Sequence, residues 1–485
     1  MEISTPGWVK HAVFYQIFPD RFARSQQASS SLGLTWEPWE TSPTLHGYKG
    51  GDLWGARDRL DYLANLGITA IYFTPIFQSA SNHRYHTHDY YRVDPLLGGN
   101  TAFQEFLAAA HARDIKVILD GVFNHASRGF FGFNDILENG KSSPWLDWFK
   151  IQGWPLAPYS PRKAPNYDCW WNNRALPQFN HANPAVREYL MGVAEYWVRQ
   201  GIDGWRLDVP EEIRAPGFWQ EFRARIKAIN PEAYIVGEVW GNASTWLDGS
   251  QFDAVMNYLF AGPTIAFVAG DRVVRKYAER QDYEPYPALD AVGYAAKIEA
   301  LLGLYAPAIQ QAQLNLLASH DTARLLTLAG GDRASVELAT LLLLTFPGAP
   351  CIYYGDEVGL PGGNDPDCRR GFPPEEQWDR ELLAAHQQLI ALRHRYPALR
   401  TGAYKVVRAE GSIYAFARLG ASAGDASVLV VVNTGTEAQT IALDTSVFAA
   451  VPTQIVYGTP QVQTSEGIVS LTVLARSGCA IAGDS

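Results

Sequence analysis

The stretch GIDGWRLDVP, residues 201–210, places two charged residues, Arg206 and Asp208, at the end of a short apolar segment that reads as a buried strand. Burying two charges is expensive unless they have a purpose there. Similar β-branched segments recur along the chain and alternate with longer segments of helical period. That alternation is typical of a parallel sheet wrapped by helices, so the stretch indicates one strand of an α/β fold.

Eight such strands are predicted, which is the number that closes a (β/α)8 barrel. They are residues 12–18, 68–73, 115–120, 201–208, 234–238, 252–257, 314–319 and 349–355. Between them we expect crossover helices. One helix, over 101–114, begins with a capping-box pair, Thr101 and Gln104, and another begins at Asn183 and Pro184. Their buried stripes are predicted at Phe103, Phe106, Leu107 and Ala110, and at Val186, Leu190, Val193, Ala194 and Trp197.

Two further regions interrupt and follow the predicted barrel. Residues 1–123 form its first part, 124–180 a small domain inserted after the third strand, and 181–400 its second part. After a last helix near 379–395, residues 401–485 carry short alternating segments such as 412–419 and 428–433, which are typical of a β-sandwich. The predicted fold is a TIM barrel with an insert and a C-terminal β-sandwich domain.

Composition excludes several classes of partner. The net charge of −10, without long runs of like charge, favours neither nucleic acid nor an anionic membrane. The four cysteines are far apart and lack CxxC spacing, which argues against a disulfide framework or a zinc site. The amino terminus shows no apolar signal segment, and the longest apolar run, 338–346, is too short to cross a bilayer. We therefore expect a cytoplasmic protein.

Polar residues cluster where the predicted strands end, and in this fold the carboxyl ends of the strands face the substrate. The cluster comprises Asp120, Asp208, Glu238, Asp321, Arg206, His125 and His320. Clustered carboxylates repel one another, so stability alone does not explain them. Cleavage of an acetal with retention needs an ionised carboxylate as nucleophile and a protonated one as acid, about 5 Å apart. The cluster therefore predicts a glycosidase.

Neighbouring residues suggest how the carboxyls divide this work. Arg206, on the same strand face, is expected to hold Asp208 ionised by its charge. Trp240 is expected to desolvate Glu238, so that Glu238 keeps a raised pKa and acts as the acid. Asp321 fits the stabilisation of the developing positive charge. Asp120 fits two roles equally, orienting Arg206 or touching the substrate.

Four motifs resemble, in order and spacing, the signature regions of the α-amylase superfamily of glycoside hydrolases, family 13. They are DGVFNH (120–125), GWRLDVP (204–210), GEVW (237–240) and ASHDTAR (318–324). A fifth, LPQFN (176–180), resembles the region that marks the cyclomaltodextrinase, neopullulanase and maltogenic amylase group. The stretches NHRYHTHDYYRVDP (82–95) and YGDEVGLPGGNDPDCRR (354–370) look like the same group, so the resemblance covers almost the whole chain.

This resemblance implies roles for individual residues. Asp208 would be the nucleophile, Glu238 the general acid/base and Asp321 the transition-state stabiliser. The implied substrate-binding residues are Tyr85, stacking under the sugar at subsite −1; His125, Arg206 and His320, positioning it; Trp240 beside the acid; and Asp365 and Arg369, contacting the next sugars on the non-reducing side.

The resemblance also implies a substrate and a reaction. It implies retaining hydrolysis of α-1,4-glucosidic bonds in cyclomaltodextrins and maltooligosaccharides, extending to pullulan and starch, with transglycosylation. An oligosaccharide is thus the expected partner. An α-glucosidase or a transglycosylating isomerase shares the three carboxyls and stays an alternative. An inactive glycan-binding barrel is less favoured because all three carboxyls are present, and the acidic loop 356–367 disfavours a phosphate-binding barrel.

The sequence departs from the group in two places. Its members commonly carry an amino-terminal β-domain that closes over the partner's active site in a dimer, whereas this sequence begins close to the first predicted strand. We therefore do not expect that domain-swapped dimer, and the oligomeric state stays open. The VPEE that follows the nucleophile, residues 209–212, also leaves the balance between hydrolysis and transfer open.

Two further points stay open. Trp170 and Trp171 fit sugar platforms and packing of the insert equally well. The resemblance implies that the position of Asn124 belongs to a calcium site in relatives. Here, however, residues 23–31 (ARSQQASSS) lack the acidic oxygen ligands that a tight calcium site uses. No cofactor is therefore expected to be required, and calcium is left undecided.

Overall fold

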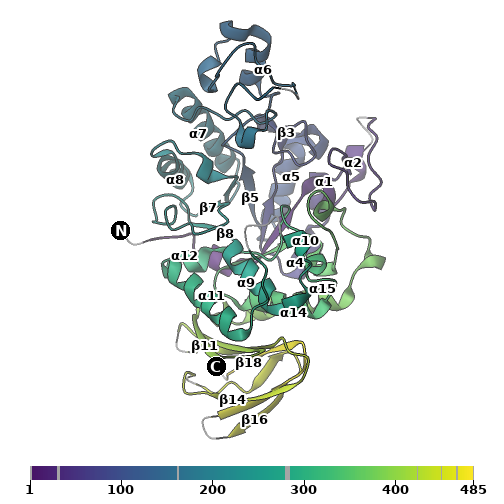
Figure 1. The fold of residues 1–485 in the computed structure, drawn as a ribbon, viewed down its shortest axis with the longest axis vertical. Helices are drawn as coiled ribbons and strands as arrows, with labels where there is room; N and C mark the ends of the chain where they lie inside the picture. The colour runs from purple at the N-terminus through teal and green to yellow at the C-terminus, as the bar shows by residue number, and fades with distance from the viewer. Residues whose placement is uncertain are drawn as a thin grey trace.

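The computed structural model describes residues 3–29, 33–160, 163–278, 284–422, 424–448, 450–465 and 468–483. At its centre eight parallel strands form a closed barrel in the order β1-β10-β9-β8-β7-β6-β5-β2 (Figure 1). The strands are β1 (Phe14–Ile17), β2 (Ala70–Phe73), β5 (Lys116–Gly121), β6 (Gly204–Leu207), β7 (Tyr234–Gly237), β8 (Ala254–Asn257), β9 (Leu314–Asn315) and β10 (Ala349–Tyr353). All eight predicted strands are confirmed. Every residue in them is buried except the half-buried Lys116, as expected for a sheet covered on both faces.

Helices surround the barrel. The longer ones are α5 (Gly99–His111), α7 (Pro184–Arg199), α8 (Phe218–Ile229), α9 (Tyr258–Val268), α11 (Ala291–Leu304), α14 (Arg333–Thr345) and α15 (Arg380–Arg395). Shorter ones are α1 (Pro19–Phe22), α2 (Gln26–Ser29), α3 (Leu53–Asp58), α4 (Leu60–Leu66), α10 (Arg275–Ala278), α12 (Pro307–Ala312), α13 (Leu325–Leu328) and α16 (Ala398–Thr401). A hairpin of β3 (Phe77–Ser79) and β4 (Thr87–Val93) follows β2.

The two predicted crossover helices differ in how they begin. Asn183 caps α7 as expected, because its side chain accepts a hydrogen bond from the Ala185 amide at 2.8 Å. The capping box predicted for α5 is wrong: the helix begins at Gly99, and its N-cap is Gly98, with φ 96° and no side-chain cap. The Asn100 side chain instead accepts from the Val93 amide at 2.7 Å, so the preceding strand organises this turn. Both predicted apolar stripes are buried.

The seventh barrel strand is shorter than predicted. Only Leu314 and Asn315 belong to β9, whereas the expected strand ran to residue 319. The chain leaves the ladder and turns at Ser319, whose amide donates to Thr322 Oγ1 at 2.9 Å. The histidine and aspartate that follow therefore lie in a turn beyond the strand end.

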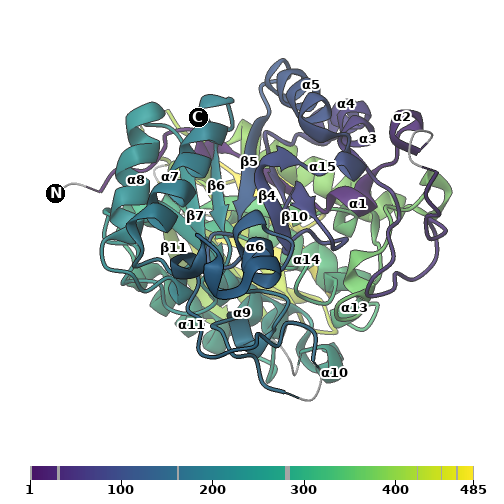
Figure 2. The same ribbon diagram turned by 90° about the horizontal axis from the view of Figure 1, so that it is seen from above.

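The chain leaves the barrel between β5 and α7 to form the insert. This region contains α6 (Phe131–Asn139) and isolated β-bridges, among them His125 with Gln178 and Cys169 with Pro177. Figure 1 places α6 at the end of the molecule opposite the C-terminal sheets, and Figure 2, which looks down on that end, shows it in front of the barrel strands. The insert therefore overhangs one end of the barrel.

The C-terminal region is a β-sandwich, as predicted. A five-stranded sheet has the order β11 (Ala403–Glu410), β12 (Ile413–Leu419), β13 (Val428–Asn433), β18 (Ser477–Ala482) and β15 (Gln454–Tyr457). A three-stranded sheet has the order β14 (Gln439–Asp444), β17 (Ile468–Val473) and β16 (Gln461–Ser465). Residues from both sheets, including Leu429, Val431, Val469 and Leu471, form a separate buried core between them.

Two features bear on the predicted environment of the protein. None of the helices in the described ranges combines the length and the apolar character needed to cross a bilayer. All four cysteines, Cys169, Cys351, Cys368 and Cys479, are free thiols.

Candidate active site

The four acidic residues predicted at strand ends converge at one end of the barrel. Asp120 is the next-to-last residue of β5, Asp208 and Glu238 directly follow β6 and β7, and Asp321 lies in the turn beyond β9. Their side chains point to the same edge because the strands are parallel. Asp120 is fully buried, and only about a tenth of the Asp208 and Glu238 side chains is exposed.

Arg206 connects three of these carboxyls. Its Nη1 lies 2.9 Å from Asp120 Oδ1 and 3.0 Å from Asp208 Oδ1, and its Nη2 lies 2.9 Å from Glu238 Oε2. Asp120 also accepts hydrogen bonds from the hydroxyls of Tyr72, at 2.8 Å, and Tyr85, at 2.9 Å. Because Asp120 is enclosed by these donors, its position fits the orientation of Arg206 rather than contact with a substrate.

The turn after Asp208 is strained and contacts the second carboxyl. Val209 has φ 35° and ψ 52°, a left-handed conformation that β-branched residues rarely adopt. In this conformation its amide donates to Glu238 Oε2 at 3.1 Å. Strained residues of this kind gather at functional sites, where surrounding contacts hold them. The VPEE segment thus helps to place Glu238 beside Asp208.

Trp240 does more than desolvate Glu238. Its indole Nε1 donates to Glu238 Oε1 at 3.2 Å, which favours the ionised form and lowers the pKa of Glu238. The indole itself stacks on Tyr258, with ring centroids 3.6 Å apart. Burial of the carboxyl outweighs this hydrogen bond, so the pKa of Glu238 is raised, which is the expected direction.

Burial dominates the titration of the cluster. It raises the pKa of Glu238 and raises the pKa of Asp208 well above its usual value, with Arg206 opposing the rise at both residues. It also raises the pKa of Asp120 to about 6. Arg206 contacts Asp208 and Glu238 at almost equal distances, so this arginine alone does not decide which of the two is ionised. Neighbouring carboxyls that cannot all ionise retain a proton, which a general acid needs.

Tyr85 and His320 form a stacked pair beside the carboxyls. Their ring centroids are 5.5 Å apart with an interplanar angle of 9°, and the Tyr85 hydroxyl lies 2.6 Å from His320 Nε2. The side-chain amide of Gln16, in β1, lies 2.8 Å from His320 Nδ1. Burial, with Arg369 and Arg206 nearby, lowers the pKa of His320 well below its usual value, so the ring is neutral.

The remaining predicted residues lie around this centre. Asp321 Oδ2 lies 3.2 Å from His320 Nε2, and Asp321 Oδ1 lies 3.4 Å from Arg369 Nη2. Arg369 also pairs with Asp365 at 3.0 Å. His125 is buried next to the backbone of Tyr85, and burial lowers its pKa to about 3. The structure thus brings together all the residues to which the sequence assigned a role.

Sequence reasoning missed Gln16, Tyr72, Tyr258 and the strained Val209. Gln16 carried a signal, because it is the one polar residue of the buried segment FYQI. Tyr72 and Tyr258 carried none, since aromatic residues in or next to barrel strands are ordinary core residues.

The suggested calcium ligand is otherwise engaged. Asn124 Oδ1 accepts from Gln178 Nε2 at 2.8 Å, and Asn124 Nδ2 lies 3.2 Å from His125 Nδ1. Within the described ranges, no group of three or more His, Cys, Asp or Glu side chains is arranged to hold a metal ion. Residues 30 and 31 of the stretch 23–31 lie outside these ranges. The amide of Asn124 is thus hydrogen-bonded within the protein on both its oxygen and its nitrogen side.

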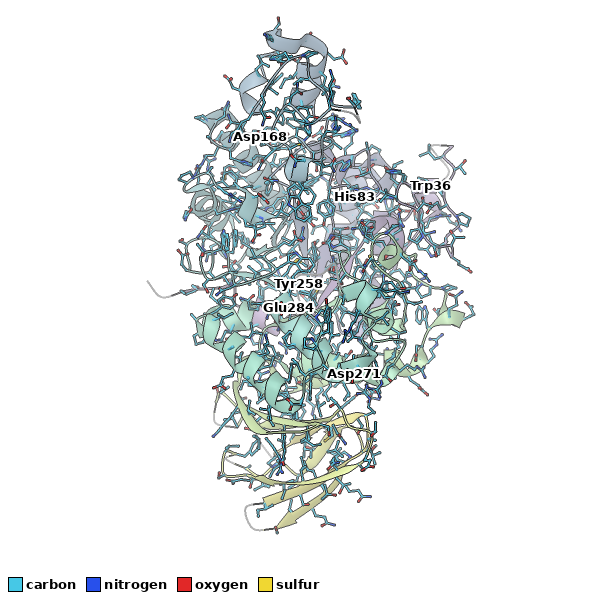
Figure 3. All side chains as sticks on the ribbon, viewed as in Figure 1. Trp36, His83, Asp168, Tyr258, Asp271 and Glu284 are labelled. Carbon is cyan, nitrogen blue, oxygen red and sulfur yellow. The ribbon has the colours of Figure 1, made fainter. Side chains whose placement is uncertain are left out.

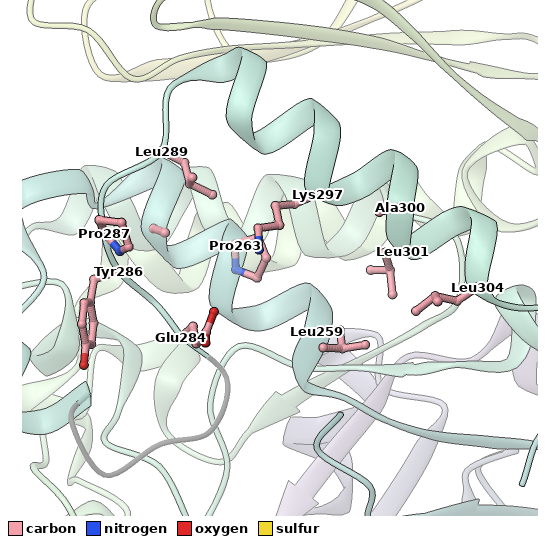
Figure 4. Close-up of a pocket in the computed structure, with 11 residues that line it drawn as sticks. Leu259, Pro263, Glu284, Tyr286, Pro287, Leu289, Lys297, Ala300, Leu301 and Leu304 are labelled. Atoms are coloured by element: carbon pink, nitrogen blue, oxygen red, sulfur yellow. The ribbon is translucent and has the colours of Figure 1, made fainter. Parts of the chain in front are cut away.

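A hollow of about 380 Å³ lies elsewhere, on the flank of the barrel between α9 and α11 (Figure 4). Leu259, Pro263, Tyr286, Lys297 and Leu304 are among the residues that line it, and none of the clustered carboxyls does. Figure 3 labels Asp168 in the insert and His83, two residues before Tyr85. His83 lies on the side of the barrel nearer the insert. The catalytic candidates thus belong to the barrel end and not to this hollow.

Comparison with known proteins agrees with this geometry. Residues 16–373 match the family described as alpha amylase, catalytic domain. Among solved structures, the native form of the Nostoc punctiforme debranching enzyme is 64% identical, with a TM-score of 0.93 over 99% of this chain and 100% of that one. The cyclic alpha-maltosyl-(1→6)-maltose hydrolase from Arthrobacter globiformis, in complex with that sugar, is 35% identical, with a TM-score of 0.86 over 99% of this chain and 100% of that one.

A curated relative, a cyclomaltodextrinase of Geobacillus thermopakistaniensis, is 44% identical over 444 residues, which cover 90% of this chain and 71% of that protein. The family match spans most of the chain and includes every strand end that carries a clustered carboxyl. The chain therefore belongs to the α-amylase family of glycoside hydrolases, and it is an α-glucan hydrolase.

Proposed function

We propose that the protein hydrolyses α-1,4-glucosidic bonds of cyclomaltodextrins and maltooligosaccharides with retention of configuration, and that it also acts on pullulan and starch and transfers glycosyl units. The observation that carries this proposal is Arg206, which holds Asp208 and Glu238 on one guanidinium group at 3.0 and 2.9 Å. Retaining glycosidases need two neighbouring carboxyls of this kind.

In the proposed reaction Asp208 attacks the anomeric carbon, and Glu238 gives its proton to the departing glycosidic oxygen. A glycosyl ester on Asp208 results. Glu238, now ionised, takes a proton from water, and the water attacks the anomeric carbon and releases Asp208. If a sugar hydroxyl replaces the water, the product is a transfer product. Asp321, held by Arg369 and His320, stabilises the positive charge on the sugar ring in both steps.

The binding residues follow from the same centre. Tyr85 stacks under the sugar at subsite −1, and His125, Arg206 and His320 position it. These two histidines are neutral, so they exchange hydrogen bonds with sugar hydroxyls without adding charge. Trp240 borders the acid, and Asp365 and Arg369 reach the next sugars on the non-reducing side.

A second candidate reaction is the hydrolysis of α-1,6 branch linkages. It is favoured by the similarity to the protein named as a debranching enzyme, which extends over the full length of that chain. The carboxyls would have the same roles for either linkage, so the subsites around them would decide the preference.

The test compares rates on β-cyclodextrin, maltotriose, pullulan and soluble starch, with products identified by chromatography and the anomer of fresh product by NMR. The proposal expects an α-anomer and faster attack on β-cyclodextrin than on starch. A β-anomer would contradict retention. Release of single glucose units from maltotriose, with β-cyclodextrin untouched, would make the protein an α-glucosidase. Preferred cleavage at the α-1,6 linkages of pullulan would favour the second candidate.

The proposal includes partners and surroundings. The expected partner is the oligosaccharide substrate. The net charge of −10 opposes binding to nucleic acid and to anionic membranes. We also propose that the protein is cytoplasmic and that its activity requires no cofactor. Fractionation of the source cells would test the location.

A further inference from the structure

The exposed aromatic side chains of the described residues gather on the insert. Large apolar side chains with more than a third of their surface exposed include four aromatics, namely Phe131, Trp154, Tyr159 and Trp171. All four belong to residues 124–180, whereas the others are aliphatic. Trp171 is the most exposed of them, at 78%. These four residues thus belong to the part of the chain that overhangs one end of the barrel (Figure 2).

One of these rings is connected to the candidate active site by stacking. The His125 and Trp170 rings stack with centroids 5.5 Å apart and an interplanar angle of 25°. Trp170 and Trp171 stack in turn, with centroids 4.8 Å apart and an angle of 12°. His125 borders Tyr85, the expected platform of subsite −1. The three rings therefore lead from that subsite to the surface.

The backbone holds the outermost ring in an unfavourable conformation. Trp171 has φ 48° and the next residue, Asn172, has φ 59°, both in the left-handed region that costs free energy for residues other than glycine. The turn is nevertheless well ordered by hydrogen bonds. The Trp170 amide donates to the Leu176 carbonyl at 3.1 Å, and the Asn173 amide donates to the Trp170 carbonyl at 2.8 Å. Hydrogen bonds within the protein thus hold the backbone of the turn that carries Trp171.

Packing of the insert does not account for Trp171. The insert has its own aromatic core, in which Trp148, Phe149 and Phe179 are buried. Trp171 leaves most of its ring in water, which forgoes the gain from burial. Trp170 is half-buried and stacks against Trp171 on one face.

We propose that Trp171, backed by Trp170, is a sugar-binding platform on which a glucosyl unit of a longer α-glucan stacks outside subsite −1. The inference rests on the proposed function. The platform is a specificity determinant: it favours long chains over short ones, because a short substrate held at the carboxyls does not extend to the surface of the insert. Its contribution comes from apolar ring contact, so it acts on binding and not on the chemical step.

The test is the ratio of kcat/KM for maltoheptaose to kcat/KM for p-nitrophenyl α-maltoside. In Trp171→Ala we expect this ratio to fall about tenfold, mainly through a higher KM for maltoheptaose. Trp171→Phe keeps a flat ring and should restore the ratio to within about threefold of the wild-type value. The matched control is Trp154→Ala, a second exposed tryptophan of the insert without stacking to His125, which should leave the ratio unchanged.

Three results would overturn the platform: an unchanged ratio in Trp171→Ala, an equal fall in Trp154→Ala, or no rescue by phenylalanine. The design separates this inference from the proposed function. If the wild-type protein hydrolyses neither substrate, the proposed function fails. If it hydrolyses both and the ratio is insensitive to Trp171, only the platform fails. Because Trp171 is mostly exposed, thermal unfolding of its variants should match that of the wild type.

Discussion

Two of the places where this molecule buries arginine side chains compensate the charge in different ways. At the carboxyl end of the barrel, Arg206 meets three carboxyls. At the junction with the β-sandwich, Arg393 and Arg418 are equally buried, but they donate to main-chain carbonyls. Arg393 Nη1 reaches the carbonyls of Leu344, Phe346 and Leu399 at 3.1, 3.2 and 3.0 Å, and Arg418 Nη1 reaches Leu399 at 2.8 Å.

The difference separates a structural from a catalytic use of buried charge. The last carbonyls of a helix such as α14 lack partners within the helix, and an arginine there satisfies several of them at once. Nothing at the junction is chemically reactive. At the carboxyl end, the carboxyls raise one another's pKa values and have no comparable structural need. We therefore expect substitutions at the first place to affect turnover and substitutions at the second to affect stability.

The largest effect should come from Asp208→Ala. Removing the proposed nucleophile should lower kcat by about 10⁴-fold or more, because the other carboxyls do not replace it. Hydrolysis of β-cyclodextrin followed by chromatography measures this loss. Circular dichroism should show an intact fold, since Asp208 belongs to a site and not to the packed core. Retention of more than about a hundredth of the wild-type rate would contradict the assignment.

A paired substitution tests the comparison itself. Arg393→Met leaves several buried carbonyls without a donor and should lower the free energy of unfolding by about 3 kcal/mol or more, with kcat per folded molecule unchanged. Arg206→Met should instead abolish most of the activity. Urea unfolding gives the free energy of unfolding of both variants, and kinetics on one substrate give the kcat of both. Loss of activity in Arg393→Met at full stability would break the comparison.

Burial of the Asp120 carboxyl should make the free energy of unfolding depend on pH. Burial raises the pKa of Asp120 to about 6, above its unfolded value, so its stabilising contribution is present at low pH and is lost as pH rises through 6. Asp120→Asn removes this titration. Between pH 4.5 and pH 8 its unfolding free energy should improve relative to wild type by about 1–3 kcal/mol. Urea unfolding at both pH values measures this, and a pH-independent difference would refute it.

A smaller effect is expected at Gln16. With its amide donating to His320 Nδ1, the proton of the ring lies on Nε2, facing Tyr85 and Asp321. Gln16→Leu should lower kcat about tenfold through loss of this hydrogen bond. Gln16→Glu should in addition raise the pKa of His320, so the acid limb of the pH–rate profile moves to higher pH. Equal profiles for the two variants would argue that Gln16 only fills space.

The smallest effect should come from metal removal. Because the Asn124 carbonyl oxygen accepts from Gln178 and the described residues hold no cluster of metal ligands, excess EDTA should leave the rate on β-cyclodextrin unchanged. Rapid inactivation that added calcium reverses would show that activity requires a bound metal ion.

Much of the fold could be predicted because its signals are local. Eight buried strands, the cap at Asn183 and the alternating segments of the sandwich each depend on residues close together in sequence. The beginning of α5 and the length of β9 were not predicted, because they depend on single side chains that bond to nearby backbone amides, Asn100 to Val93 and Thr322 to Ser319. Such bonds follow from side-chain geometry and leave no periodic signal in the sequence. The hydrogen bond from Trp240 to Glu238 was not predicted either. The spacing of Trp240 indicated proximity but not the direction of its N–H group.

The sequence by itself determined the barrel, the insert, the sandwich, the family and the convergence of four carboxyls, because strand polarity places the residues that follow parallel strands at one edge. Only the tertiary structure decided how those carboxyls share Arg206, which neighbours raise or lower their pKa values, that Gln16 contacts His320, and that Trp171 stands exposed on a stack of rings. Those outcomes depend on distances of about 3 Å and on burial. Both arise when the elements pack together, in the case of Gln16 and His320 from positions 304 residues apart, and no local pattern encodes them.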